Sequence, residues 1–127
     1  MFIDMPPGTG DVPLTVFQSI KLDGIVIVTT PQDLVSMIVG KAVNMAALMN
    51  IPVIGLVENM SYVVCPRCQE KIHIYGERKH EYEYPLLGQI PFDSDLTKLV
   101  DQGRVEEFNK DYIDDLVNLV KNKLEEK

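Results

Sequence analysis

The sequence predicts an α/β protein built on a parallel sheet with flanking helices, and three observations support this fold class. Short apolar runs, mostly of β-branched residues, recur along the chain. Helical patterns separate these runs, and the links between them are short. Such alternation is typical of parallel strands joined by right-handed crossovers. At 127 residues the chain is long enough for one domain, residues 1–127, and too short for two.

The first elements are read from the start of the chain. Two apolar residues precede Asp4, and we expect residues 1–4 to form a strand in the interior of the sheet. Residues 12–20 fit a short helix, because proline is tolerated in the first turn of a helix. Residues 24–30 are a continuous β-branched run and predict a strand covered on both faces.

The middle of the chain repeats this alternation. Asp33 is a candidate N-cap, and apolar residues recur at helical spacing from there to Met49. Residues 52–57 predict a second buried strand, and residues 86–91 predict a shorter one. Between them we expect an irregular insert, residues 60–85, which carries both cysteines, both histidines and four of the five tyrosines.

The last part of the chain is predicted to be helical. Residues 93–102 fit a short helix that stops at Gly103. An apolar stripe from Tyr112 to Leu124 predicts an amphipathic closing helix.

The composition argues against two classes of partner. A formal net charge of −7 and a pI near 4.7 leave no broad basic face, so we expect no nucleic-acid partner. No apolar run reaches the roughly 18 residues of a bilayer span, and the N-terminus lacks the features of a signal peptide. We therefore expect no membrane partner and a cytoplasmic location. In that reducing compartment, two closely spaced cysteines favour a metal or redox role over a structural disulfide.

An acidic residue and a proline- and glycine-rich turn follow the first expected strand. Residues 4–11 combine Asp4 with two prolines and two glycines, which places a carboxylate and free backbone N–H groups where a nucleotide's magnesium and terminal phosphate would lie. The alternative is that Asp4 only caps the next helix. The sequence contains no glycine-rich loop ending in Gly-Lys-Ser or Gly-Lys-Thr, since Gly40-Lys41 is followed by alanine.

Several polar or turn residues fall where the expected strands end. They are Asp4, Thr30, Asn59 and Pro91. The carboxyl ends of parallel strands share one edge of a sheet, and ligands bind there. Asn59 either terminates its strand or pairs with the edge of a purine through one donor and one acceptor.

The two cysteines form a Cys-x-x-Cys motif, Cys65 to Cys68, within the insert. Such a turn brings two sulfurs to one metal, but zinc or an iron-sulfur cluster usually needs four ligands. His73 and His80 could complete a mononuclear zinc site, although each also fits a solvated loop position. A thiol-disulfide pair is another alternative. We favour a homodimer in which each copy supplies two cysteines to a bridging metal or cluster.

Four motifs of the chain, in this order and spacing, resemble the Mrp/ApbC family. They lie at residues 4–11, 28–33, 58–62 leading into 65–68, and 88–93. Members of that family are deviant-Walker P-loop ATPases, related to MinD and the nitrogenase iron protein, that act as iron-sulfur cluster carriers. The match runs from the first residue to about residue 104. The resemblance implies a partial P-loop NTPase fold.

The resemblance also implies roles for the residues at the strand ends. Asp4 matches the Walker B aspartate, which holds magnesium through water, and Gly8 belongs to the switch segment that senses the γ-phosphate of ATP. Asn59 matches the asparagine that contacts adenine, and Pro91 begins a loop near the base.

For the cysteines, the resemblance implies cargo binding. Cys65 and Cys68 match the pair that bridges a 4Fe-4S cluster across a homodimer, from which the cluster would pass to apoprotein acceptors. Two other functions remain open: a zinc-stabilised interaction module without cluster transfer, and a positioning ATPase related to MinD.

The sequence departs from the family pattern in two places. The family's N-terminal half with its Walker A loop is missing, so the chain resembles a C-terminal portion with an insert at about residues 60–85, and we expect it alone neither to hydrolyse ATP nor to bind it tightly. Residues 75–84 are short and polar where the family has a Gly-rich segment and a longer helix. A strand at residues 1–4 would also have an open edge, through which we expect self-association or a partner chain.

Overall fold

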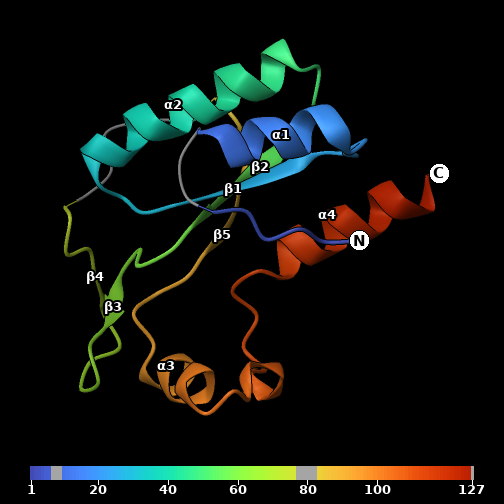
Figure 1. Cartoon of the computed structure of the whole chain (residues 1–127). Coiled ribbons are helices and arrows are strands. Elements are labelled where there is room, and N and C mark those ends of the chain that lie inside the picture. The colour runs from blue at the N-terminus through green and yellow to red at the C-terminus, as the bar shows by residue number, and fades with distance from the viewer. Residues whose placement is uncertain (7–9, 77–82, 127) are drawn as a thin grey trace.

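The computed structural model describes residues 1–6, 10–76 and 83–126, and it confirms the predicted α/β class (Figure 1). The main sheet has three parallel strands in the order β1-β2-β5, namely β1 (Ile25–Thr29), β2 (Val53–Glu58) and β5 (Leu86–Gln89). The helices are α1 (Asp11–Ser19), α2 (Asp33–Leu48), α3 (Ser94–Asp101) and α4 (Asp114–Glu125), with a 3₁₀ turn, η1 (Val105–Glu107), after α3. In the described part of the chain, no helix is long and apolar enough to cross a bilayer.

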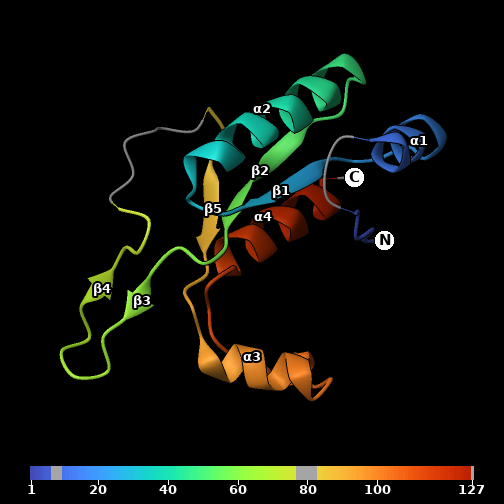
Figure 2. The same ribbon diagram turned by 60° about the vertical axis from the view of Figure 1, so that its left-hand side comes forward.

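The sheet lies between α2 and α4, with α1 on the β1 side (Figures 1 and 2). The core consists of small and branched apolar residues from α2, the loop after it and β2: Val39, Ala46, Ile51, Leu56 and Val57. β2 is central because it can bury side chains on both faces, and its last four residues are all buried. The edge strands β1 and β5 are only partly buried.

The register of the sheet aligns the strand ends. Thr29 of β1 pairs with Glu58 of β2, and Glu58 pairs with Gln89 of β5. All three strands are parallel, so their carboxyl ends share one edge. α3 and the hairpin described below project from this edge (Figure 2).

The strand expected at residues 1–4 is wrong. Residues 1–6 form no strand, and the side chain of Phe2 is 87% exposed. The N-terminal end lies off the sheet, near α4, in both views (Figures 1 and 2). A strand is stabilised by its neighbours, and among the described residues β1 is an edge strand with no strand on its other side. The open edge expected at residues 1–4 therefore belongs to β1.

The expectation that residues 24–30 are covered on both faces is also wrong. Val28 of β1 is 66% exposed. Its strand has one sheet neighbour, β2, and α2 packs on it from one face. Continuous β-branched sequence therefore marks the strand here but not its burial.

The insert is more regular than predicted. It contains an antiparallel hairpin of β3 (Val63–Val64) and β4 (Lys71–Ile72). The chain reverses through the Cys-x-x-Cys turn, where Gln69 takes a left-handed backbone conformation at φ 61°. The two strands are too short for their alternation to stand out in the sequence. We call residues 63–72 the thiol hairpin.

The helices of the last third follow their capping signals. Asp93 is the N-cap of α3, and Gly103 at φ 66° ends that segment as predicted. α4 begins at Asp114, later than the apolar stripe that starts at Tyr112. Tyr112 instead lies beside Gly88 of β5, and its hydroxyl donates to Asp93, the N-cap of α3.

Candidate functional site

Backbone hydrogen bonds tie the strand ends to the loops that follow them. The N–H of Asn59 donates to the carbonyl oxygen of Thr29 at 2.7 Å, and the N–H of Ile90 donates to the carbonyl oxygen of Glu58 at 2.8 Å. Thr30, Asn59 and Pro91 therefore lie at the ends of adjacent strands, as the sequence predicts. The Oδ1 of Asn59 accepts the N–H of Met60 at 2.9 Å, which fixes the orientation of the amide.

The structure does not bring Asp4 into this group. Asp4 is exposed and forms no hydrogen bond with another described residue. Gly8 lies outside the described residues. The roles expected of Asp4 and Gly8 in nucleotide binding stay predictions.

A buried polar cluster at the same edge was missed by sequence reasoning. Glu58 is 3% exposed, and its Oε1 accepts the hydroxyl of Ser61 at 2.6 Å and the Nε2 of Gln89 at 3.4 Å. Burying a carboxylate is costly unless donors reach it. The available signal was a charged residue at the end of an otherwise apolar run, followed three positions later by serine.

The same segment anchors the thiol hairpin to the sheet. The N–H of Ser61 donates to the carbonyl oxygen of Ile90, and the N–H of Phe92 donates to the carbonyl oxygen of Tyr62, both at 2.9 Å. Tyr62 is 7% exposed, and its ring lies 6.2 Å from that of His73, centroid to centroid. The Nζ of Lys71 lies 4.6 Å from the Tyr62 ring centroid. The hairpin base is therefore fixed to the loop after β5.

The Cys-x-x-Cys turn is arranged to hold thiolates. Cys65 is half-buried and Cys68 is exposed, and neither forms a disulfide. The backbone N–H groups of Cys68 and Arg67 and the thiol of Cys68 donate to the Cys65 sulfur, and they lower the pKa of the Cys65 thiol against the opposing effect of burial. Thiolates are the form that binds zinc, iron and iron-sulfur clusters.

The turn itself is closed by two further backbone bonds. Cys65 donates its N–H to the carbonyl oxygen of Glu70, and Gln69 donates to the carbonyl oxygen of Cys65, both at 2.9 Å. Within the described ranges, no three His, Cys, Asp or Glu side chains come together as a metal site. His73 contacts Tyr62 instead, and His80 lies outside those ranges. The described part of one copy thus offers two sulfur ligands.

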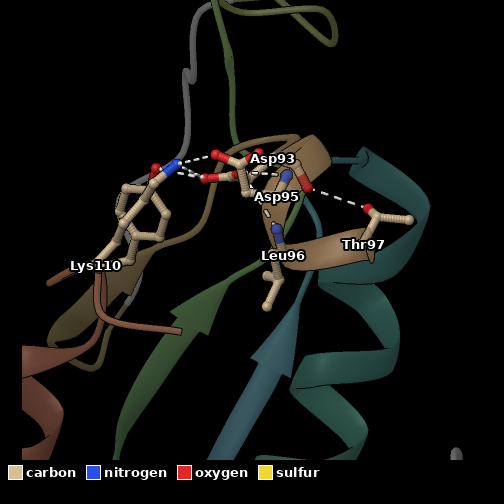
Figure 3. Close-up of polar contacts among 6 residues, drawn as sticks. Asp93, Asp95, Leu96, Thr97 and Lys110 are labelled. Atoms are coloured by element: carbon tan, nitrogen blue, oxygen red, sulfur yellow. Dashed lines mark hydrogen bonds and ion pairs between the residues drawn. The ribbon is translucent and has the colours of Figure 1, made fainter. Parts of the chain in front are cut away.

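Asp93, which follows Pro91 by two positions, fixes the loop after β5 (Figure 3). Its Oδ1 accepts the N–H groups of Asp95 at 2.9 Å and Leu96 at 3.3 Å. Its Oδ2 accepts the Nζ of Lys110 at 2.5 Å and the hydroxyl of Tyr112 at 2.9 Å. Burial would raise the pKa of this carboxyl, but these donors, Lys110 foremost, lower it to about 2.

Replacing Asp93 with asparagine should destabilise the fold by about 1–2 kcal/mol at pH 7, because the neutral side chain still caps α3 but loses its charge interaction with the exposed side chain of Lys110. The carboxyl has a pKa near 3.8 when unfolded and about 2 when folded, so its stabilisation is complete above about pH 4 and is lost as pH falls toward 2. Urea unfolding should show the two proteins converging over that range. Asp95→Asn, at a 65% exposed side chain, is the control and should change stability little.

Comparisons with known proteins show the family to which the chain belongs. A family model described as ParA, the NUBPL iron-transfer P-loop NTPases, matches residues 1–124. The chain belongs to this family. Its similarity to the iron-sulfur cluster carrier protein of Clostridium perfringens is 47% identity over 113 residues, which cover 85% of this chain and 39% of the relative.

Other members of the NUBPL family show the same relation. The iron-sulfur cluster carrier protein of Pyrococcus abyssi is 51% identical over 108 residues, covering 81% of this chain and 37% of the relative. The iron-sulfur cluster transfer protein NUBPL of Mus musculus is 42% identical over 115 residues, covering 87% of this chain and 36% of the relative. The chain therefore spans less than half the length of these curated relatives.

A solved structure supports the P-loop NTPase fold. It is a nucleotide-binding protein from Archaeoglobus fulgidus in complex with ADP, with a TM-score of 0.75 and 49% sequence identity. The match covers 85% of this chain and 46% of that protein. This confirms the expected partial P-loop NTPase fold and the resemblance stated from the motifs.

Proposed function

We propose that the chain carries an iron-sulfur cluster in the cytoplasm and passes it to apoprotein acceptors. The cargo is a 4Fe-4S cluster bound by Cys65 and Cys68 together with the same two residues of a second copy. The observation that carries this proposal is the Cys-x-x-Cys turn, whose N–H groups point at the Cys65 sulfur. A cluster takes four thiolates, and a two-fold axis supplies the second pair. The names of the relatives, cluster carrier and cluster transfer proteins, agree with it.

The geometry of the thiol hairpin suggests which surface meets the second copy. Val63 pairs with Ile72, and the backbone bond from Cys65 to Glu70 continues the same ladder. Side chains alternate between faces along a strand, so Val63, Cys65 and Ile72 share one face, opposite the face of buried Tyr62. Ile72 is 49% exposed and adjoins the half-site of two sulfurs. A second copy seated there completes the ligand set and covers this apolar side chain.

Changing Ile72 to glutamate should therefore weaken cluster-bound dimerisation by about tenfold or more, because it places a carboxylate in an apolar contact beside an anionic cluster. Sedimentation of the reconstituted protein over a concentration series measures this. Val64→Glu is the matched control, because Val64 is 37% exposed on the opposite face and pairs with Lys71. Equal dimer dissociation constants for the two variants would contradict this choice of surface.

At the sheet edge we propose a nucleotide site in which Asn59 and Pro91 lie near the base. For Asp4, which the structure does not bring to this edge, and for Gly8, the proposed roles in holding magnesium and sensing the terminal phosphate rest on the motif of residues 4–11 alone. The amide of Asn59 and the adjoining strand ends fit the base side of ATP. The sequence has no phosphate loop, so its own residues do not fit the phosphate side, and the proposal includes no hydrolytic step.

Anaerobic reconstitution with iron and sulfide tests the proposal. We expect a brown dimer with one cluster for two chains. The alternative function, a zinc-stabilised interaction module, predicts a colourless protein that retains one zinc per chain and does not dimerise with iron. A MinD-like positioning ATPase would have no need of the two thiols. A monomer that takes up neither iron nor sulfide would contradict the carrier proposal.

A further inference from the structure

One short segment, residues 59–62, joins the sheet edge to the thiol hairpin, and we call it the linker. Its four residues all take part in hydrogen bonds with strand ends, with the loop after β5 or with each other. Met60 takes a left-handed conformation at φ 54°, so the linker bends sharply as it leaves β2. Figure 2 shows the chain passing from β2 to β3 beside the end of β5. The linker thus belongs to both parts of the candidate site.

Ser61 is the point at which these contacts meet. It is 2% exposed, its hydroxyl donates to the buried Oε1 of Glu58 at 2.6 Å, and its N–H donates to the carbonyl oxygen of Ile90 at 2.9 Å. Ile90 immediately precedes Pro91, and Cys65 follows Ser61 by four positions. Any displacement of Ser61 therefore moves the base of the thiol hairpin and the loop after β5 together.

Burying the carboxylate of Glu58 at this position has an unfavourable desolvation free energy. An apolar side chain of similar volume would avoid the desolvation of Glu58. A short hydroxyl-carboxylate bond, however, has one preferred distance and direction, whereas apolar packing allows several. The pair is thus suited to fixing a position rather than to adding stability.

We propose that Ser61 and Glu58 are positioning residues that fix the thiol hairpin relative to the loop after β5. They touch neither nucleotide nor cargo, and they act through the linker. The inference rests on the proposed function, because it takes the hairpin as the cluster-binding element and the loop after β5 as part of the nucleotide edge. Through the hydrogen bonds of the linker, the position of the thiol hairpin and the position of the loop after β5 are fixed together.

Hydrogen exchange of the backbone amides tests the positioning role without any cargo. In Ser61→Ala we expect the amides of Cys65, Gln69 and Phe92 to exchange about tenfold faster, because their bonds depend on the linker. The amides of β1 and β2 should change less than about twofold. Glu58→Gln keeps an acceptor oxygen for Ser61 and should stay close to the wild type. Thr97→Ala, which removes an exposed hydroxyl bonded to the carbonyl oxygen of Asp93, is the matched control and should leave these amides unchanged.

The visible circular dichroism of the reconstituted cluster is the second measurement. Ser61→Ala should alter the band shape of this spectrum while the iron content per chain stays the same. The separate variant Glu58→Gln should keep the wild-type spectrum. A purely structural role would instead speed exchange evenly over the sheet and leave the spectrum of loaded protein unchanged, and either result would overturn the proposal. If the wild type takes up no iron, the carrier function fails while the exchange measurement still decides the positioning role.

If Ser61→Ala does not fold, its hydrogen exchange cannot be compared with that of the wild type, so a milder variant is also measured. Gln89→Ala removes only the longer bond to Glu58, at 3.4 Å, from an exposed side chain. It should speed exchange at the same three amides by a smaller factor. If Gln89→Ala showed the same exchange pattern as the wild type, that result would count against the positioning role of Ser61 and Glu58.

Discussion

Replacing either Cys65 or Cys68 with serine is expected to abolish cluster binding and the cluster-dependent dimer together. A serine hydroxyl stays protonated near neutral pH and is a poor ligand for iron, whereas a thiolate is a strong one. Each substitution removes two of the four ligands of a site shared by two copies, so the loss should be near complete. Iron and sulfide content per chain, read with the mass from light scattering, measures both effects.

The matched control for the cysteines is Arg67→Gln in the same turn. Arg67 contributes its backbone N–H to the Cys65 sulfur, and its exposed side chain is not a ligand. This variant should keep full iron content and the dimer. A cluster retained by Cys65→Ser, or lost equally in Arg67→Gln, would show that the cargo is held elsewhere.

The sequence was sufficient to predict the elements whose signals are local. The stop at Gly103 and the apolar run of β2 each depend on a few neighbouring residues, and each appears where expected. The N-cap expected at Asp33 is wrong, because α2 begins at Asp33 itself and Gln32 is its N-cap. The shared edge of Asn59 and Pro91 also followed, because parallel strands in one sheet must end on the same side.

What could not be predicted depends on contacts between distant segments. The order β1-β2-β5 and the exposure of Val28 depend on which neighbours each strand has, and periodicity carries no information on that. The bonds from Lys110 and Tyr112 to Asp93 span 17 and 19 positions, and the bond from Gln89 to Glu58 spans 31. The strand expected at residues 1–4 failed for the same reason, since an apolar run becomes a strand only beside a partner.

The alignment of Glu58 with Gln89 depends on Gly55, a residue of the central strand β2 that lies outside the candidate site. Glu58 and Gln89 are adjacent because β2 and β5 pair closely over Leu56–Glu58 and Leu86–Gln89. Gly55 lies at the start of this pairing, where a side chain would point at Leu87 and at the carbonyl oxygen of Pro85. That carbonyl accepts the N–H of Leu56 at 2.9 Å, so it cannot withdraw without breaking a bond of the sheet.

Gly55→Ala should therefore destabilise the protein by about 2–3 kcal/mol. The new Cβ would lie 2.8 Å from the Pro85 oxygen and 2.5 Å from Cδ1 of Leu87, so β5 must shift relative to β2. Gly40→Ala is the matched control, because nothing lies within 4 Å of its added Cβ in α2, and helix propensity should stabilise it by about 0.5–1 kcal/mol. Urea unfolding followed by far-ultraviolet circular dichroism should move the two midpoints in opposite directions. Equal urea midpoints for Gly55→Ala and Gly40→Ala would mean that β5 shifts without loss of stability. The alignment of Glu58 with Gln89 would then not depend on close pairing of β2 and β5.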